Sequence, residues 1–406
     1  MTDEETPDYV IPPGGGVPWM DMSMDGTGRP PDREIEITDV RSMAIQGNFT
    51  WGLVKVETDA GIHGVGETHG RGPDGPGQLE GENPLDVGRL VDSRMPVGPG
   101  VEMALWDIKG KVLDAPVYEL LGGKYRESVR IYCDTHAGES LGEAQSEDVD
   151  PREVYTPESY ARAAREVIDE GFEALKFDLD VRTHREVDTA ARRLDNAAIR
   201  HKVSLVEAVR EEIGYDVDLG FDLHWNFTAE TASRLATKLE GYDLAWLEDP
   251  VPPHEYDAHR RVREATDVPI LTGENLADPG EFREMLDAEG MDLAAPDPHN
   301  CGGLLNFTRI ATLCDLEGVP VAAHNIQSPV GTVAGAHASA AIPNFVALEY
   351  HARDVPWWED LVARTGESGD VIEDGWIDLP EGPGLGVEID PDVAAEYALD
   401  GEDVIF

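Results

Sequence analysis

The sequence has few cysteines, few basic residues and no long apolar run. Its three thiols, Cys133, Cys301 and Cys314, are scattered without paired spacing, which argues against a disulfide framework or a zinc cluster. Lys and Arg together number 32 among 406 residues, whereas Asp and Glu number 82, giving a net charge of −50. Such a chain repels nucleic acid and anionic membrane surfaces, so we expect neither as a partner. No apolar run is long enough to span a bilayer.

The acidic residues are spread along the whole chain, which argues against an acidic interaction tail. A chain of this charge repels itself when compact, but at molar salt the Debye length falls to about 3 Å and removes most of that repulsion. We therefore expect a protein of a salt-loving cell. The start MTDEETPDYV is acidic and unlike a signal peptide, so we expect a cytoplasmic location.

The chain divides by pattern into four parts. Residues 1–33, rich in Pro and Gly, are expected to form an N-terminal arm, and residues 34–128 an α+β capping domain. Residues 129–355 alternate short apolar runs and amphipathic segments eight times, which predicts an α/β fold of the (β/α)8 barrel type, TIM-like. Residues 356–406 are expected to return to the capping domain.

The stretch GFDLHWNF, residues 220–227, has an unusual polar pattern. Asp222, His224 and Asn226 follow two-residue spacing, which would place their side chains on one face of a strand. A buried strand does not normally present a carboxylate, an imidazole and an amide together. Functional groups of parallel barrels lie at the C-terminal ends of the strands, so a site is expected here.

Three carboxylates stand at the ends of three successive apolar runs: Asp222, Glu248 and Glu274. Because neighbouring strands lie about 4.8 Å apart, these side chains should converge. Without a cation they would raise one another's pKa, and an all-oxygen ligand set favours Mg²⁺. For any one of the three alone, a helix N-cap or a solvated turn is the alternative.

Together these motifs resemble the enolase superfamily and, within it, the mandelate racemase group, over roughly residues 35–390. The runs VKVETDAGIHGVGE and MALWDIKGKVLDAPVYELLGG are similar to the family's capping domain. The resemblance implies that Asp222, Glu248 and Glu274 bind Mg²⁺. It also implies a Lys or His base that removes a proton next to a carboxylate, with Mg²⁺ stabilising the ene-diolate.

The resemblance further implies an Asp–His dyad, which Asp297 and His324 match by order and context; a core histidine is the alternative for His324. Glu349 matches the residue that hydrogen-bonds the substrate carboxylate. His299 is expected to cap or line the following turn, and His351 to support its neighbours.

The run LKFDLD separates possible reactions. Racemases of the superfamily carry Lys-X-Lys here, but this chain has Lys176 followed by Asp178, which argues against a two-base racemase. Lys176 is expected to contact the substrate carboxylate, or to act as a base if its pKa is lowered. FDLHWN resembles the Asp-X-His of acid-sugar dehydratases, which makes His224 the general acid and Asn226 a substrate contact. The alternative is that His224 only bonds a neighbouring carboxylate.

We therefore expect a Mg²⁺-dependent dehydratase, a hydro-lyase, of 2R aldonic acids such as gluconate, xylonate, arabonate or galactonate. Asp178 and the loop residues Asn48, Trp51 and Arg71 are expected to contact the sugar acid, and no further cofactor is expected. The alternatives are a racemase or epimerase on the same fold, and a barrel that binds without turnover. By resemblance we expect a homo-oligomer, from dimer to octamer.

Overall fold

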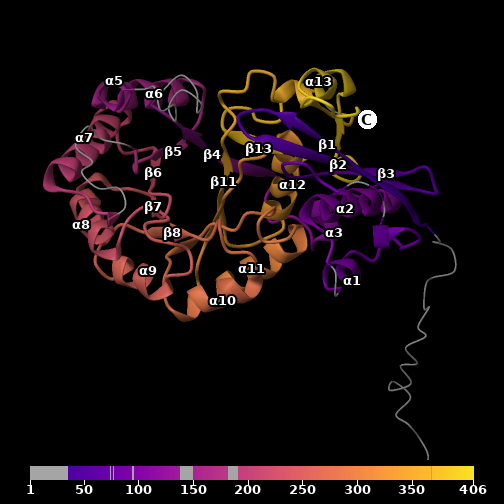
Figure 1. Cartoon of the computed structure of the whole chain (residues 1–406), viewed down its shortest axis with the longest axis horizontal. Coiled ribbons are helices and arrows are strands. Elements are labelled where there is room, and N and C mark those ends of the chain that lie inside the picture. The colour runs from indigo at the N-terminus through magenta and orange to yellow at the C-terminus, as the bar shows by residue number, and fades with distance from the viewer. Residues whose placement is uncertain are drawn as a thin grey trace, which may run out of the picture. The chain divides into compact units, whose positions relative to one another are not determined.

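In the computed structural model of the chain, eight parallel strands form a closed barrel (Figure 1). Strand β4 pairs with β5 on one side and with β11 on the other, which closes the ring. The predicted barrel is thereby confirmed. The barrel strands are β4 (Ser128–Thr135), β5 (Ala174–Asp178), β6 (Asp218–Asp222), β7 (Trp246–Glu248), β8 (Ile270–Thr272), β9 (Leu293–Ala294), β10 (Val321–Ala323) and β11 (Phe345–Tyr350).

The structure describes residues 35–73, 75, 77–93, 96–137, 150–181, 191–366 and 368–406. The predicted arm, residues 1–33, lies outside these ranges. Residues Glu36–Phe406 form one compact unit. Within the described ranges, each helix is too short or too polar to cross a membrane.

Helices follow the strands and surround them in Figure 1. Several begin at side chains that accept hydrogen bonds from first-turn N–H groups, among them Thr156, Asp195, Thr228 and Asp278. Their apolar faces cover strands that are buried on both sides. The helices are α5 (Pro151–Val154), α6 (Pro157–Asp169), α7 (Asn196–Ile213), α8 (Ala229–Leu239), α9 (Tyr256–Arg263), α10 (Pro279–Asp287), α11 (Leu304–Leu316) and α12 (Pro329–Ala340).

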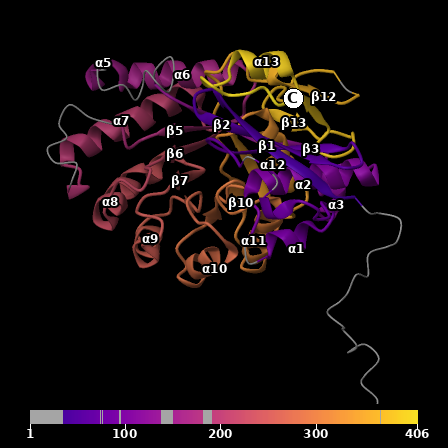
Figure 2. The same cartoon turned by 45° about the vertical axis from the view of Figure 1, so that its right-hand side comes forward.

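An antiparallel sheet of β1 (Ile37–Gln46), β2 (Thr50–Thr58) and β3 (His63–His69) packs against α2 (Pro99–Leu113). Figure 2 shows α2 beside this sheet, with the short helices α1 (Val87–Val91) and α3 (Val117–Leu120) close by. The approach of β3 to α2 requires glycine, because a Cβ on Gly64 or Gly66 would lie 2.0 or 2.1 Å from a carbonyl oxygen of α2.

The C-terminal segment joins the barrel to the N-terminal sheet. Strand β13 (Trp376–Asp378) pairs with β4, and β12 (Val362–Arg364) pairs with β14 (Val387–Ile389) before helix α13 (Pro391–Glu396). After α13 the chain bonds to β1: Gln46 N–H donates to Tyr397 O and Leu399 N–H to Ala44 O, both at 2.9 Å. The segment therefore contacts the sheet, whereas the predicted domain boundaries stay predictions.

Two buried side chains fasten the N-terminal region to helix α12 of the barrel. The carboxylate of Glu67, on β3, accepts backbone N–H groups of Ser328 and Gly331 at 3.0 Å at the start of α12. His337, within α12, accepts from Tyr118 N–H at 3.2 Å and lies 3.1 Å from Leu385 O. These contacts hold the N-terminal sheet near the C-terminal ends of the strands.

Candidate active site

Asp222, Glu248 and Glu274 converge at the C-terminal ends of β6, β7 and β8. One carboxylate oxygen of each lies within 4.8 Å of the other two, and all three residues are buried. Asp222 and Glu248 are the last residues of their strands, and Glu274 follows β8 by two residues. The convergence expected from strand spacing is confirmed.

The residues of this cluster fit a divalent cation. Burial, together with Asp222, Glu349 and Glu274, holds the pKa of Glu248 well above its usual range. Among the described residues, neither oxygen of Glu248 has a hydrogen-bond donor, although its Oε2 lies 3.2 Å from Lys176 Nζ. Buried, unsatisfied carboxylate oxygens are hard ligands of the kind that Mg²⁺ prefers. The geometry thus suits the predicted metal without showing which ion binds.

Lys176, on β5, lies among four carboxylates. Its Nζ is 2.8 Å from Glu349, 3.0 Å from Asp222, 3.2 Å from Glu248 and 3.6 Å from Asp134. Burial would lower the pKa of Lys176, but the surrounding carboxylates raise it well above its ordinary value. A role as base and a role in binding the substrate carboxylate both stay predictions for Lys176. Lys176 is a cation suited to binding a substrate carboxylate.

The structure brings Asp297 and His324 together. Nδ1 of His324 lies 2.7 Å from Asp297 Oδ2, and Nε2 lies 3.5 Å from Glu274 Oε2. Burial opposes protonation of His324, whereas Glu274, Glu349 and Asp297 raise its pKa; a cation held by Glu274 would offset part of this rise and let Nε2 accept a proton. His299 is buried as well, and its backbone N–H donates to Asp297 Oδ1 at 2.6 Å. Asp297 therefore orients His324 with Nε2 facing the carboxylate cluster.

The prediction that Asp222, His224 and Asn226 share one strand face is wrong. Strand β6 ends at Asp222, and His224 and Trp225 adopt left-handed φ values of 40° and 50°. The chain turns here because Trp225 N–H donates to Asp249 O, past the end of β7. The turn still leaves His224 at the site, with its Nε2 3.9 Å from Asp222 Oδ2.

Three acidic residues surround His224. Its Nδ1 lies 3.3 Å from Asp180 and 3.8 Å from Asp178, and Asn226 donates to Asp180 as well. Burial alone would lower the pKa of His224, but Asp222, Asp180 and Asp178 raise it to about 12. His224 therefore carries a proton that it can deliver. The alternative, a purely supporting role, is compatible with the same contacts.

Glu349, on β11, is fully buried beside Lys176 and His324. Its Oε2 accepts from Tyr132 OH at 3.0 Å and from Asn325 N–H at 3.1 Å. Lys176 and His324 lower its pKa to about 2 against the effect of burial. Glu349 is an ionised group that fixes Lys176 at the base of the site.

A cavity of about 260 Å³ lies over these groups. Its wall includes Lys176, Asp178, Asp222, His224, Glu274, His324 and Glu349, and also Phe49, Asp134, His136, Asn275, Asn300, Ile326 and His351. Except for His351, the residues of the second set were not predicted from the sequence to be part of the site. The pattern Asp-X-His at Asp134 and His136, repeated at the end of the first barrel strand, was a signal that could have found two of them.

The three predicted contacts Asn48, Trp51 and Arg71 do not line the cavity, although Asn48 and Trp51 bond to residues of its wall, and Trp51 lies in β2 rather than in a loop. Asn48 donates to His351 O at 2.7 Å and to Asp354 at 3.0 Å. The indole N–H of Trp51 donates to Ile326 O at 2.9 Å, and Arg71 pairs with Glu402 at 2.9 Å. In this arrangement each is engaged with protein, so direct contact with a substrate stays a prediction.

The comparison with known families agrees with this site. The model described as "Enolase C-terminal domain-like" matches residues 159–393, and the "Mandelate racemase / muconate lactonizing enzyme, N-terminal domain" model matches residues 87–122. The chain belongs to the mandelate racemase/muconate lactonizing enzyme group of the enolase superfamily. It is an enzyme of that group, and several of its relatives are named dehydratases, which are hydro-lyases.

Relatives and solved structures extend the similarity over most of the chain. D-xylonate dehydratase of Haloferax volcanii is 42% identical over 391 residues, covering 91% of this chain and 90% of the relative. D-gluconate dehydratase of Thermoproteus tenax is 30% identical over 308 residues, covering 75% of this chain and 56% of the relative. A mandelate racemase/muconate lactonizing enzyme-like protein from Rubrobacter xylanophilus superposes with a TM-score of 0.85 at 38% identity, covering 92% of this chain and all of that one.

Proposed function

We propose that the protein is a Mg²⁺-dependent dehydratase of aldonic acids, with D-xylonate as the first candidate substrate. One observation carries the proposal: two imidazoles lie beside the carboxylate cluster, each next to a different carboxylate. Nε2 of His324 lies 3.5 Å from Glu274, and Nε2 of His224 lies 3.9 Å from Asp222. A base and an acid around one anion-binding site suit removal of a proton and a hydroxyl from adjacent carbons. The relative named D-xylonate dehydratase supports the substrate class.

In the proposed reaction, His324 takes the C2 proton at Nε2 while Asp297 holds the ring through Nδ1 and stabilises the imidazolium. Lys176 holds the substrate carboxylate through its ammonium group, and Glu349 fixes that ammonium group in place. A divalent cation held by Asp222, Glu248 and Glu274 would stabilise the second negative charge that develops on the substrate carboxylate.

His224 completes the reaction from the other side. It gives its proton to the 3-hydroxyl, the C3–O bond breaks, and water leaves as the C2–C3 double bond forms. The resulting enol tautomerises to a 2-keto-3-deoxy acid. The carboxylates of Asp178, Asp180 and Asp222 around the His224 ring favour its protonated form, which a general acid needs before the hydroxyl departs.

A substrate screen tests the proposal. The purified protein, in molar KCl with Mg²⁺ because of its charge of −50, is mixed with C5 and C6 aldonic acids. Formation of 2-keto acid is read as semicarbazone absorbance, with EDTA as the control. EDTA-sensitive product from one or a few 2R acids is the expected result.

The screen also separates the alternatives. No keto acid, combined with exchange of the C2 proton in D₂O, would favour an epimerase or racemase. Neither product nor exchange from folded, Mg²⁺-supplied protein would contradict the proposal and favour a binding protein. The salt-loving source, the cytoplasmic location and the homo-oligomer stay predictions; light scattering after size-exclusion chromatography tests the last.

A further inference from the structure

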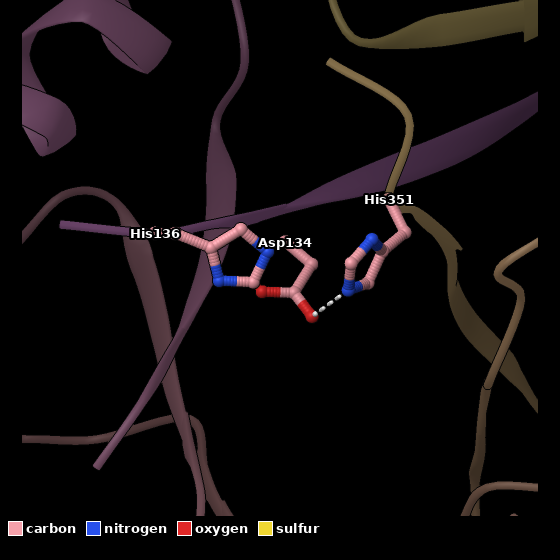
Figure 3. Close-up of side chains that lie close together, drawn as sticks. All are labelled: Asp134, His136 and His351. Atoms are coloured by element: carbon pink, nitrogen blue, oxygen red, sulfur yellow. Dashed lines mark ion pairs between the residues drawn. The ribbon is translucent and has the colours of Figure 1, made fainter. Parts of the chain in front are cut away.

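A second cluster lines the cavity and is not used in the proposed chemistry. Asp134 and His136 lie at the end of β4, and His351 follows β11. One ligand atom of each lies within 4.8 Å of those of the other two. Figure 3 shows the two imidazoles on either side of the Asp134 carboxylate, with Nε2 of His351 3.3 Å from Asp134 Oδ2.

Two buried polar atoms in this cluster lack a partner among the described residues. They are Oδ1 of Asp134 and Nε2 of His136. Asp134 is only 3% exposed, and the His136 side chain is 9% exposed. A buried polar group without a partner is destabilising, and both residues line the cavity. The wall is therefore incomplete without a polar ligand.

The neighbours of His351 define its state. Nε2 of His351 lies 3.3 Å from Asp134 Oδ2, and with its hydrogen on Nε2 the ring can donate to that carboxylate. Burial, with His136 nearby, lowers the pKa of His351 to about 3, consistent with a neutral ring. This ring therefore positions Asp134.

A bound metal is the other ligand that an Asp–His–His cluster suggests, but one contact opposes it. The ammonium group of Lys176 lies 3.6 Å from Asp134 Oδ2 and repels a second cation. A hydroxyl fits better, since it can donate to the carboxylate and accept from an imidazole N–H at the same time.

A single carboxylate, that of Asp178, links this cluster to His224, the proposed general acid. Asp178 lies 3.8 Å from Nδ1 of His224 through Oδ1 and 3.6 Å from Nδ1 of His136 through Oδ2. Burial would lower the pKa of His136, but Asp178 and Asp134 raise it to about 9, which leaves an N–H at Nε2. If His224 serves the 3-hydroxyl, a hydroxyl at His136 belongs to a more distant carbon.

We propose that Asp134 and His136, positioned by His351, bind a hydroxyl of the substrate beyond C3 and so select aldonic acids by their tail. This inference rests on the proposed function and assigns specificity to residues of the barrel. Asn48 contributes indirectly, by holding His351 from the N-terminal sheet.

The test combines two variants with substrates that lack single hydroxyls. Asp134→Asn and His136→Gln are compared with wild type on D-xylonate and on its 4-deoxy and 5-deoxy analogues, with Mg²⁺ in molar KCl. For wild type, removing the bound hydroxyl should lower kcat/KM by about 10–100-fold. In both variants this penalty should shrink to near unity, because the partner is gone. The exposed His254→Gln serves as the matched control and should keep the wild-type penalty.

Other results would overturn the inference. Equal losses on all three substrates would show a structural role, and so would a wild type indifferent to both hydroxyls. Thermal unfolding checks that each variant folds. If His136→Gln does not fold, the milder variant Asp134→Asn still provides the test.

The result also distinguishes this inference from the proposed function. If wild type turns over no aldonic acid, the same comparison is read by ligand-induced thermal shift. Hydroxyl-dependent binding without turnover would contradict the dehydratase and support the subsite, whereas binding indifferent to the hydroxyls would overturn the subsite.

Discussion

Nδ1 of His324 lies 2.7 Å from Asp297 Oδ2, so the ring presents its other nitrogen to the carboxylate cluster. The two residues come from consecutive strand ends, after β9 and after β10. A carboxylate at this distance selects the tautomer with hydrogen on Nδ1 and leaves Nε2 to accept a proton. The pair forms a base whose orientation is set by the fold.

Substitution Asp297→Asn should remove this orientation without changing size. We expect kcat to fall by about 10²–10⁴-fold with a smaller change in KM, since the lost contact acts on the proton transfer. Exchange of the C2 proton in D₂O should fall by the same factor as dehydration. Exchange at the wild-type rate would show that another group is the base.

Substitution His224→Asn should separate the two half-reactions. We expect formation of 2-keto acid to be lost, while exchange of the C2 proton continues because His324 and Asp297 are untouched. NMR in D₂O measures exchange, and the semicarbazone assay measures product in the same sample. Loss of both activities in a folded variant would assign His224 to binding rather than to the departure of the hydroxyl.

Mg²⁺ should raise the thermal stability of the protein. A cation that binds only the folded state stabilises it by about 2.7 kcal/mol at one hundred times its Kd. The variant Glu248→Gln should lose this response, while its stability without Mg²⁺ should equal or exceed that of wild type, because a buried carboxylate has been neutralised. Calorimetry with and without EDTA measures both. An undiminished Mg²⁺ response in this variant would remove Glu248 from the ligand set.

His337 should make the protein sensitive to acid. Burial lowers its folded-state pKa to about 4, whereas the unfolded chain has about 6.5. The neutral ring therefore contributes stability above pH 6.5, and this contribution is lost as the pH falls toward 4. From these values wild type should lose about 2 kcal/mol between pH 7.5 and pH 5 through this residue.

The variant His337→Gln measures that contribution. This variant should be less stable than wild type at pH 7.5, but its free energy of unfolding should fall by about 2 kcal/mol less between pH 7.5 and pH 5. Urea unfolding at the two pH values in molar KCl measures that difference. The control variant His254→Gln, at an exposed position, should lose as much stability between the two pH values as wild type does. Parallel declines in wild type and His337→Gln would show that His337 is not the titrating group.

The barrel and the convergence of its carboxylates could be predicted because both follow from local sequence patterns. Each apolar run is followed by an amphipathic segment, and a closed parallel barrel buries eight such runs, with helices outside and side chains inside. Polar residues at the ends of parallel strands must then meet at one edge. The convergence of Asp222, Glu248 and Glu274 follows from strand spacing alone.

The turn after β6 could not be predicted from spacing. Alternation of polar and apolar residues suggested that the strand continues, but left-handed φ values at His224 and Trp225 end it. What stabilises the turn is a hydrogen bond from Trp225 N–H to Asp249 O, a residue on the neighbouring strand end. Such a partner is not visible in a local pattern.

The sequence by itself determined the barrel and the convergence of three carboxylates, since both depend on order along the chain and on strand geometry, whereas the pairing of Asp297 with His324 was expected from the family resemblance. Only the tertiary structure decided the surroundings of each charged group. Lys176 lies among four carboxylates, and Asp134 meets His351 because closure of the barrel pairs β4, its first strand, with β11, its last. Those contacts join residues far apart in the chain, and their energies depend on burial, which arises only when the barrel closes.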